Sequence, residues 1–195
     1  YAAQVQGLGK TEDDIAFLRY EHEYRNVILV EQPNKDFAWV IARQFFFDAY
    51  HKPLLEQLAS SKDAQLSAIA HKSLKEVQYH HYFSSEWVKR LGDGTEESNT
   101  RMQDAINHFW PYIGELFEET ALEKEMKENG TGADLSAIKP VFKSCTNEIM
   151  AEAGITVPSS EWSHSGGKKG THSEHLGFIL AELQYMQRAY PNMTW

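Results

Sequence analysis

An aspartate and a histidine in the middle of a predicted helix have the types and the spacing of metal ligands. Asp48 and His51 stand three positions apart, so both side chains project from one face of a helix. A carboxylate and an imidazole at this spacing are typical of helical bundles that bind two iron ions, which use two such pairs and two further glutamates. The first question is therefore where the remaining ligands lie.

A second polar pair occupies the next predicted helix, at about residues 63–91. Glu76 and His80 lie in the middle of a stripe whose two ends are apolar. The short link at residues 59–62 favours an antiparallel arrangement with the preceding helix, at about residues 36–58. The two polar pairs could therefore converge.

The following helix argues against a complete di-iron centre. Asp104 and Asn107 imitate the ligand spacing, but at about 100° per residue Asp104 lies roughly opposite the apolar face, and an amide is a poor iron ligand. The apolar face carries no carboxylate or imidazole, and it consists of Met102, Ile106, Phe109, Ile113 and Leu116. We therefore expect no metal site in this chain.

Two interpretations are open for the four polar residues Asp48, His51, Glu76 and His80. In the first, carboxylates and imidazoles form a buried network and neutralise one another. In the second, they bind a metal, and the chain is a cryptic metal-dependent oxidase. The first is favoured, and it predicts that Asp48, His51 and Glu76 lie buried and hydrogen-bonded to one another.

A glycine-rich loop, Gly166–Gly170, precedes the last predicted helix. Its backbone N–H groups, together with Lys168 and Lys169, could bind the phosphates of coenzyme A, which would make the chain a CoA-binding module. The loop lacks the spacing of a P-loop. The alternative is a turn that caps the helix.

The composition limits the class of protein. The chain has 195 residues, of which 42% are hydrophobic, and this is enough for one domain over residues 1–195. A net charge of −9 argues against nucleic-acid binding. No apolar run is long enough to cross a bilayer. The single cysteine, Cys145, excludes an internal disulfide and favours a cytoplasmic location.

The periodicity predicts an all-α protein without strands. The first residues read as the end of a helix, so we expect that an upstream segment, including the first helix of a bundle, is missing. The expected helices span about residues 11–30, 36–58, 63–91, 98–119 with a bend at Pro111, and 172–190, with a further helical segment at 135–153.

Several segments resemble one known family, the phenylacetic acid catabolism C subunit. This is the ferritin-like, non-catalytic subunit of ring-1,2-phenylacetyl-CoA epoxidase, a multicomponent bacterial monooxygenase. The resemblance covers essentially the whole chain. It is carried by residues 26–34 (NVILVEQPN), 41–51 (IARQFFFDAYH), 75–80 (KEVQYH), 166–177 (GGKKGTHSEHLG) and 181–186 (AELQYM).

The resemblance implies a ferritin-like helical bundle that scaffolds a paralogous catalytic subunit of A type. That subunit would hold the di-iron centre and the thioester, while a reductase supplies electrons from NADPH. The chain itself would have no cofactor and would not be an enzyme on its own. Asp48 and His51 stand where the catalytic paralogue has Glu-x-x-His, and Gln44 replaces a lysine, so the ligand positions would be vestigial.

The resemblance also implies a docking face for the catalytic subunit and the other epoxidase components, with a homodimer left open. Its candidates are aromatic residues that do not lie on the polar stripe: Trp39, Phe45, Phe46, Tyr50 and Tyr82. The alternative is that these side chains contact accessory helices around Leu135 and Leu183. We expect the isolated chain to have neither iron nor monooxygenase activity.

Overall fold

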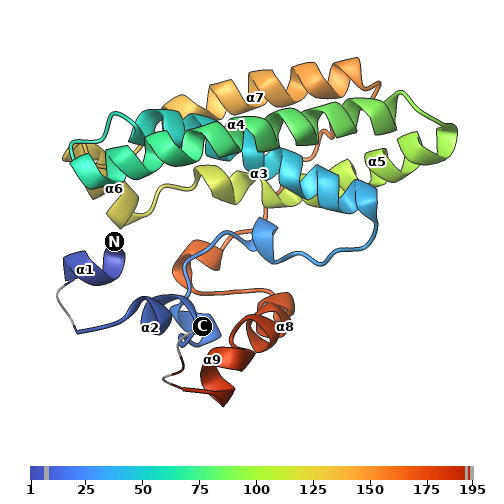
Figure 1. Ribbon diagram of the computed structural model, residues 1–195. Helices are drawn as coiled ribbons and strands as arrows, with labels where there is room; N and C mark the ends of the chain where they lie inside the picture. Colours follow the sequence, from blue (N-terminus) through green and yellow to red (C-terminus); the bar gives the residue numbers. More distant parts are fainter. Residues whose placement is uncertain (7–8, 192, 194–195) are drawn as a thin grey trace. The chain divides into compact units, whose positions relative to one another are not determined.

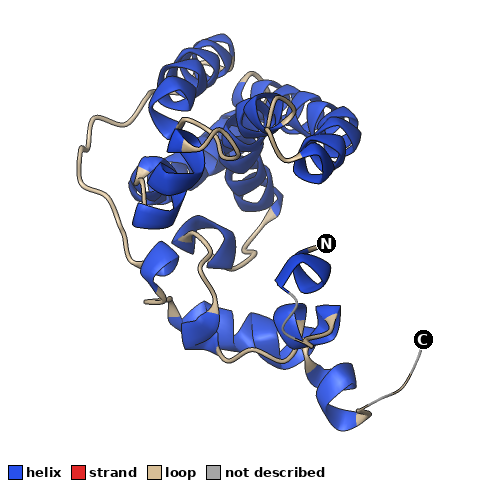
Figure 2. Ribbon diagram, turned by 90° about the vertical axis from the view of Figure 1, so that its left-hand side faces the viewer, coloured by secondary structure: helices blue, strands red, loops and turns tan. Residues whose placement is uncertain are grey.

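The structure, a computed structural model, describes residues 1–6, 9–191 and 193. Every regular element among them is helical, and they include no strand (Figure 2). The prediction of an all-α fold is therefore confirmed. None of the described helices is long and apolar enough to cross a lipid bilayer.

The chain divides into two compact units. Residues 34–164 form the continuous unit, whereas residues 1–33 and 165–195 together form the discontinuous unit. That residues 1–195 form a single domain therefore stays a prediction.

The continuous unit is a bundle of long helices (Figure 1). The central helix α3 packs against α4, α5 and α7. Two single 3₁₀ turns follow α5, so the predicted bend at Pro111 is present as a change of helix type. The helices are α3 (Phe37–Leu58), α4 (Ala64–Gly92), α5 (Glu96–Phe109), α6 (Ala121–Glu128) and α7 (Leu135–Glu152), and the 3₁₀ turns are Trp110–Tyr112 and Gly114–Phe117.

Local capping explains where these helices begin. The Asp36 carboxylate accepts a hydrogen bond from the Trp39 backbone N–H at 3.0 Å, and Asp63 caps the first turn of α4 in the same way. Thr95 and Ser98 form a reciprocal capping box at the start of α5. The predicted helices at about 36–58, 63–91 and 135–153 are confirmed within one or two residues.

The core of the continuous unit is aromatic and aliphatic. Phe46 is fully buried, and its ring contacts the rings of Phe45, Trp110 and Phe142. The predicted apolar face of α5 is also buried, and its residues are Met102, Ile106 and Phe109, followed by Ile113 and Leu116 in the turns.

The expected docking face is mostly wrong. Phe45, Phe46 and Tyr50 are buried and Trp39 is half-buried, because α3 is central and has packed neighbours on several sides. Phe46 contacts Phe142 of α7, as the alternative involving the accessory helix around Leu135 predicted. Of the five candidates, only Tyr82 is exposed.

Helix α4 buries a different face from the one its large apolar residues suggested. The expected stripe includes Ile69, Glu76, His80 and Phe83, which are all exposed. The buried face is offset by one residue, or about 100°, and consists of Ala70, Val77, Ser84, Ser85, Val88 and Gly92. Small side chains let the backbones approach closely, and a Cβ on Gly92 would lie 2.3 Å from the Ala153 carbonyl oxygen.

The discontinuous unit contains short helices and turns. The predicted helix at 11–30 is wrong, because α2 ends at Ala16 and only 3₁₀ turns follow. The predicted helix at 172–190 is divided at Gln184 into α8 and α9. The elements are α1 (Ala2–Gln6), α2 (Glu12–Ala16), α8 (Glu174–Leu183) and α9 (Tyr185–Ala189), and the 3₁₀ turns are Glu21–Glu23, Ile28–Glu31 and Gly167–Lys169.

The expected helix at residues 11–30 is interrupted, and there side chains from the C-terminal segment donate hydrogen bonds to backbone carbonyl oxygens. Gln184 donates a hydrogen bond from Nε2 to the carbonyl oxygen of Arg19 at 2.8 Å. Arg188 donates to the carbonyl oxygens of Leu18 and Arg19 at 3.2 and 3.3 Å. These carbonyls therefore have tertiary partners instead of helical ones, which periodicity in the sequence could not reveal.

Candidate functional site

Asp48 lies in the middle of α3 and is 1% exposed. One carboxylate oxygen accepts a hydrogen bond from Gln44 Nε2 at 2.6 Å, one helical turn earlier. The other accepts a hydrogen bond from Ser84 Oγ of α4 at 2.9 Å. Both oxygens of this buried carboxylate are thus held by neutral donors.

The two histidines of the predicted cluster lie near this carboxylate. His51 is half-buried, and its ring packs against Phe47 with the ring centres 5.2 Å apart. Burial lowers the pKa of His51, and the neighbouring His80 lowers it further. His80 is exposed, yet it is close enough to lower the pKa of Asp48 as well.

Glu76 does not belong to this cluster. It is exposed, because Val77 occupies the buried side of α4 at this level. Among the described residues, no hydrogen bond joins Asp48 to His51 or to Glu76, so the predicted mutual network is wrong. Ser84 takes the place of these partners. Its position seven residues after Val77 was the available signal, since that spacing returns to the same helix face.

The residues present do not fit a di-iron centre. Within the part of the chain that the structure describes, no group of three or more His, Cys, Asp or Glu side chains is arranged to hold a metal ion. The hydrogens of Gln44 and Ser84 point at the oxygens of Asp48 that a metal would need. The buried residues of α5 are all apolar, so this helix offers the core no carboxylate or imidazole.

The discontinuous unit contains a second buried carboxylate, that of Glu31, which is 1% exposed. Asn26 Nδ2 donates to Oε1 at 2.8 Å, and His172 Nδ1 lies 2.6 Å from the same oxygen. The backbone N–H and hydroxyl of Ser173 donate to Oε2 at 2.8 and 2.7 Å. Glu31 thus joins the two halves of this unit, and sequence reasoning assigned it no role.

Both ring nitrogens of His172 face oxygen atoms. Nε2 lies 3.1 Å from the carbonyl oxygen of Tyr24, which can only accept, so Nε2 must carry a proton. Nδ1 faces the Glu31 carboxylate, and the contact at 2.6 Å requires one further proton between them. The His172 ring is thus held between the Glu31 carboxylate and the Tyr24 carbonyl.

These two polar centres lie in segments that carry the resemblance found in the sequence. A family model described as "Phenylacetic acid catabolic protein" matches residues 1–195. The chain belongs to the phenylacetic acid catabolic protein family. It is also 44% identical over 195 residues to the C subunit of 1,2-phenylacetyl-CoA epoxidase from Escherichia coli (strain K12), and the match covers 100% of this chain and 78% of the relative.

The family membership confirms the resemblance predicted from the motifs, and the structure shows what two of those motifs do. Residues 26–34 and 166–177 are far apart in the chain, and they meet in the Glu31 network of this family member. Residues 41–51 hold Gln44 and Asp48, the first half of the other polar centre. The motifs therefore include residues that donate hydrogen bonds to the buried carboxylates of Glu31 and Asp48.

In this member of the phenylacetic acid catabolic protein family, close packing accounts for the glycines of the Gly166–Gly170 loop. A Cβ on Gly167 would lie 2.3 Å from the Asn26 carbonyl oxygen, and Gly170 has a positive φ of 89°. The N–H groups of Lys169, Gly170 and Thr171 all donate to carbonyls within the loop. This favours a structural turn, and phosphate binding by Lys168 and Lys169 stays a prediction.

The Asp48 carboxylate gives a test of the pH dependence of stability. Burial raises the pKa of Asp48, while Ser84, Gln44 and His80 partly offset the rise. A carboxyl whose pKa is raised on folding binds its proton more tightly in the folded state, so the free energy of unfolding falls as the pH rises from about 4 towards the folded pKa.

We expect the Asp48→Asn variant to lose this part of the pH dependence. At neutral pH it should match or exceed the parent's free energy of unfolding, by on the order of 1 kcal/mol, because no buried charge remains. Gln44 can turn its amide to accept from the new Nδ2. Urea unfolding across the pH range measures the effect, with exposed Asp104→Asn as the matched control. A loss of several kcal/mol in Asp48→Asn alone would show that the ionised form is stabilising.

Proposed function

We propose that this chain is the non-iron accessory subunit of a multicomponent monooxygenase that epoxidises the ring of phenylacetyl-CoA. In this proposal it works in the cytoplasm beside a paralogous di-iron subunit of A type, which a reductase fed by NADPH supplies with electrons. The observation that carries the proposal is the state of Asp48, whose two oxygens accept hydrogen bonds from Gln44 and Ser84. The Escherichia coli relative, named as a subunit of the epoxidase, supports the choice of complex.

A subunit without a metal can support catalysis by holding the helices of its partner. Di-iron ligands keep their geometry only if the helices that carry them are fixed by packing and by hydrogen-bonded neighbours. A bundle docked alongside supplies such packing without contacting the iron. This role requires a rigid docking surface on the accessory subunit.

The outer side of α4 has the composition of such a surface. We name it the α4 aromatic face: Tyr79, Tyr82, Phe83, Trp87 and Arg90. Tyr79, Tyr82 and Phe83 are 62%, 61% and 41% exposed. The Phe83 ring contacts the rings of Tyr79 and Trp87, and Arg90 lies 5.4 Å from the centre of the Trp87 ring.

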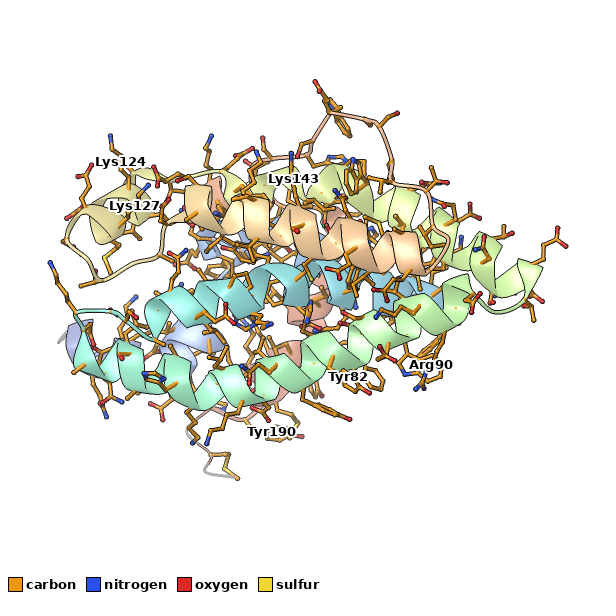
Figure 3. All side chains as sticks on the ribbon, turned by 90° about the horizontal axis from the view of Figure 1, so that it is seen from above. Tyr82, Arg90, Lys124, Lys127, Lys143 and Tyr190 are labelled. Carbon is orange, nitrogen blue, oxygen red and sulfur yellow. The ribbon has the colours of Figure 1, made fainter. Side chains whose placement is uncertain are left out.

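Figure 3 shows Tyr82 and Arg90 projecting from the outer edge of α4. Tyr, Trp and Arg are enriched among the residues that contribute most to binding at protein interfaces. The regular spacing along one long helix keeps these side chains in fixed positions. We propose that the α4 aromatic face docks against the catalytic subunit, in place of the buried residues of α3.

Removing two rings from this face tests the proposal. We expect Tyr82→Ser combined with Phe83→Ser to abolish co-purification with the catalytic subunit, because each such residue contributes about 2 kcal/mol at an interface. Circular dichroism and melting temperature should remain those of the parent, since both side chains are exposed. Pull-down yield is the measurement.

The matched control is Leu122→Ser on α6, which also removes an exposed apolar side chain, 66% exposed, from the continuous unit. The control should co-purify at the parental yield. If the double variant does so as well, the docking face lies elsewhere on the chain.

The competing function is a cryptic metal-dependent oxidase that uses Asp48, His51, Glu76 and His80. It is disfavoured because, among the described residues, no three His, Cys, Asp or Glu side chains are grouped so that they could hold a metal ion. Metal analysis of the purified chain separates the two functions. Near-stoichiometric iron together with turnover of phenylacetyl-CoA would support the oxidase and overturn the accessory role.

A further inference from the structure

The α4 aromatic face continues towards the start of α4 as a cationic stretch. Lys72 and Lys75 are exposed, and they lie on the same side of the helix as Tyr79 and Arg90. At about 100° per residue, these four positions fall within about 60° of one another. At about 1.5 Å per residue, Lys72 and Arg90 are about 27 Å apart along the axis. Cations therefore lie at both ends of this side of α4, with aromatic side chains between them.

These three cations have no carboxylate partner in the part of the chain that the structure describes. Lys72, Lys75 and Arg90 take part in no ion pair there. Glu86 of the same helix is already paired with Lys89, whose Nζ lies 3.5 Å from its carboxylate. The three charges are therefore available to a partner.

Helix α4 is positively charged within an acidic chain. It contains four Lys and Arg residues and two Glu residues, which gives it a formal charge of +2, whereas the whole chain has −9. Glu76 lies at the border of the cationic side, about 40° from Lys72, so positive charge stays in excess there. An acidic surface is attracted to this side of α4, while the negative charge of the remaining chain disfavours other orientations.

A protein helix fits this surface better than a nucleic acid does. A straight stripe of about 27 Å matches a partner helix of about 18 residues that packs alongside α4. The exposed rings of Tyr79 and Tyr82 offer apolar area to such a helix, and their hydroxyls offer hydrogen bonds. A nucleic acid binds through many phosphate contacts, and three cations on a chain of net charge −9 supply few of them.

We infer that the α4 aromatic face, together with Lys72 and Lys75, receives an acidic helix of the catalytic subunit. Carboxylates of that helix lie opposite Lys72 and Lys75 at one end and opposite Arg90 at the other, and its apolar side chains cover the aromatic rings between them. The inference rests on the proposed docking of the two subunits and adds the chemistry of the partner's surface. Exposed charges at the rim of an interface act mainly on the association rate.

Association rates with the purified catalytic subunit test the inference. The parent's rate should fall about tenfold between about 50 and 500 mM salt, because salt screens the attraction. Lys72→Glu combined with Lys75→Glu should associate about tenfold more slowly than the parent at low salt, and at nearly the parental rate at high salt. Its melting temperature should stay that of the parent, since both side chains are exposed.

The matched control is Lys124→Glu combined with Lys143→Glu, which changes the net charge by the same amount. Both lysines are exposed, and Figure 3 shows them on α6 and α7, away from Tyr82 and Arg90. The control should associate within about twofold of the parental rate, because the charge close to the contact steers the encounter more than the net charge does.

Carbodiimide cross-linking of the complex identifies the partner's surface directly. The reagent activates a carboxylate, and a lysine Nζ in contact with it then forms an amide bond. Lys72 or Lys75 should become joined to Asp or Glu residues of one helix of the catalytic subunit, whereas Lys124 and Lys143 should give no such product. Mass spectrometry of the digested complex locates the bonds.

Several results would overturn the inference. They are an association rate that does not fall with salt, equal slowing in both double variants, cross-links that avoid Lys72 and Lys75, or a DNA duplex bound as tightly as the catalytic subunit. If Tyr82→Ser with Phe83→Ser still abolishes co-purification, the docking face stands and only the acidic partner helix is rejected. If that variant co-purifies at the parental yield, the proposed docking fails, and the inference fails with it.

Discussion

Replacing Glu31 with alanine is expected to lower the free energy of unfolding of the discontinuous unit by about 3–5 kcal/mol. Four hydrogen bonds from Asn26, His172 and Ser173 converge on this buried carboxylate. The variant leaves Nδ1 of the buried His172 without its partner, and the hydroxyl and N–H of Ser173 without acceptors. Hydrogen exchange over residues 172–183 should accelerate strongly in the variant.

Glu182→Ala is the matched control, because Glu182 is an exposed carboxylate of the same unit. It should exchange as the parent does. A double-mutant cycle with His172→Ala then isolates the coupling of the pair, which we expect to be about 2–3 kcal/mol. Additive effects of the two substitutions would contradict a direct hydrogen bond between these side chains.

The second large effect concerns Phe46. We expect Phe46→Ala to cost about 3–5 kcal/mol of unfolding free energy, because it opens a cavity among Phe45, Trp110 and Phe142. Urea denaturation measures the loss, and exposed Leu122→Ala should stay within about 0.5 kcal/mol of the parent.

The position of Phe46 also decides how docking experiments must be read. A charged residue at position 46 would disrupt the core of the continuous unit. If such a variant no longer co-purified with the catalytic subunit, the cause would be unfolding and not the loss of a docking contact. If Phe46→Ala proves as stable as the parent, the packing between α3 and α7 is looser than its ring contacts indicate.

Helix positions followed from local features of the sequence. Asp36 and Asp63 cap the helices that begin after them, and apolar residues recur at helical spacing behind each cap. Asp48 was correctly placed inside the bundle on the same basis. Caps and helical spacing depend only on residues that are close together in the chain. They can therefore be predicted from the sequence.

The rest depends on contacts that the sequence does not display. The buried face of α4 is the one with small residues, such as Ser84 and Gly92, since close approach of the backbones outweighs the size of Ile69 and Phe83. The Glu31–His172 contact joins residues 141 positions apart. The Glu31–His172 contact has no local signal, whereas the spacing of Val77 and Ser84 is a weak one that the larger apolar residues of α4 outweigh. The sequence therefore predicts the Glu76 carboxylate as a partner of Asp48, and the structure places the Ser84 hydroxyl there.

The split of the discontinuous unit into two chain segments has a consequence for synthesis. The continuous unit is complete once residue 164 has left the ribosome, whereas residues 1–33 must wait for residues 165–195. Until then Glu31 remains in water, because His172 and Ser173 do not yet exist. We expect a nascent chain that stops before His172 to contain a folded bundle with a protease-sensitive N-terminal arm. We therefore expect residues 1–33 to become resistant to protease only when residues 165–195 are present to pack with them.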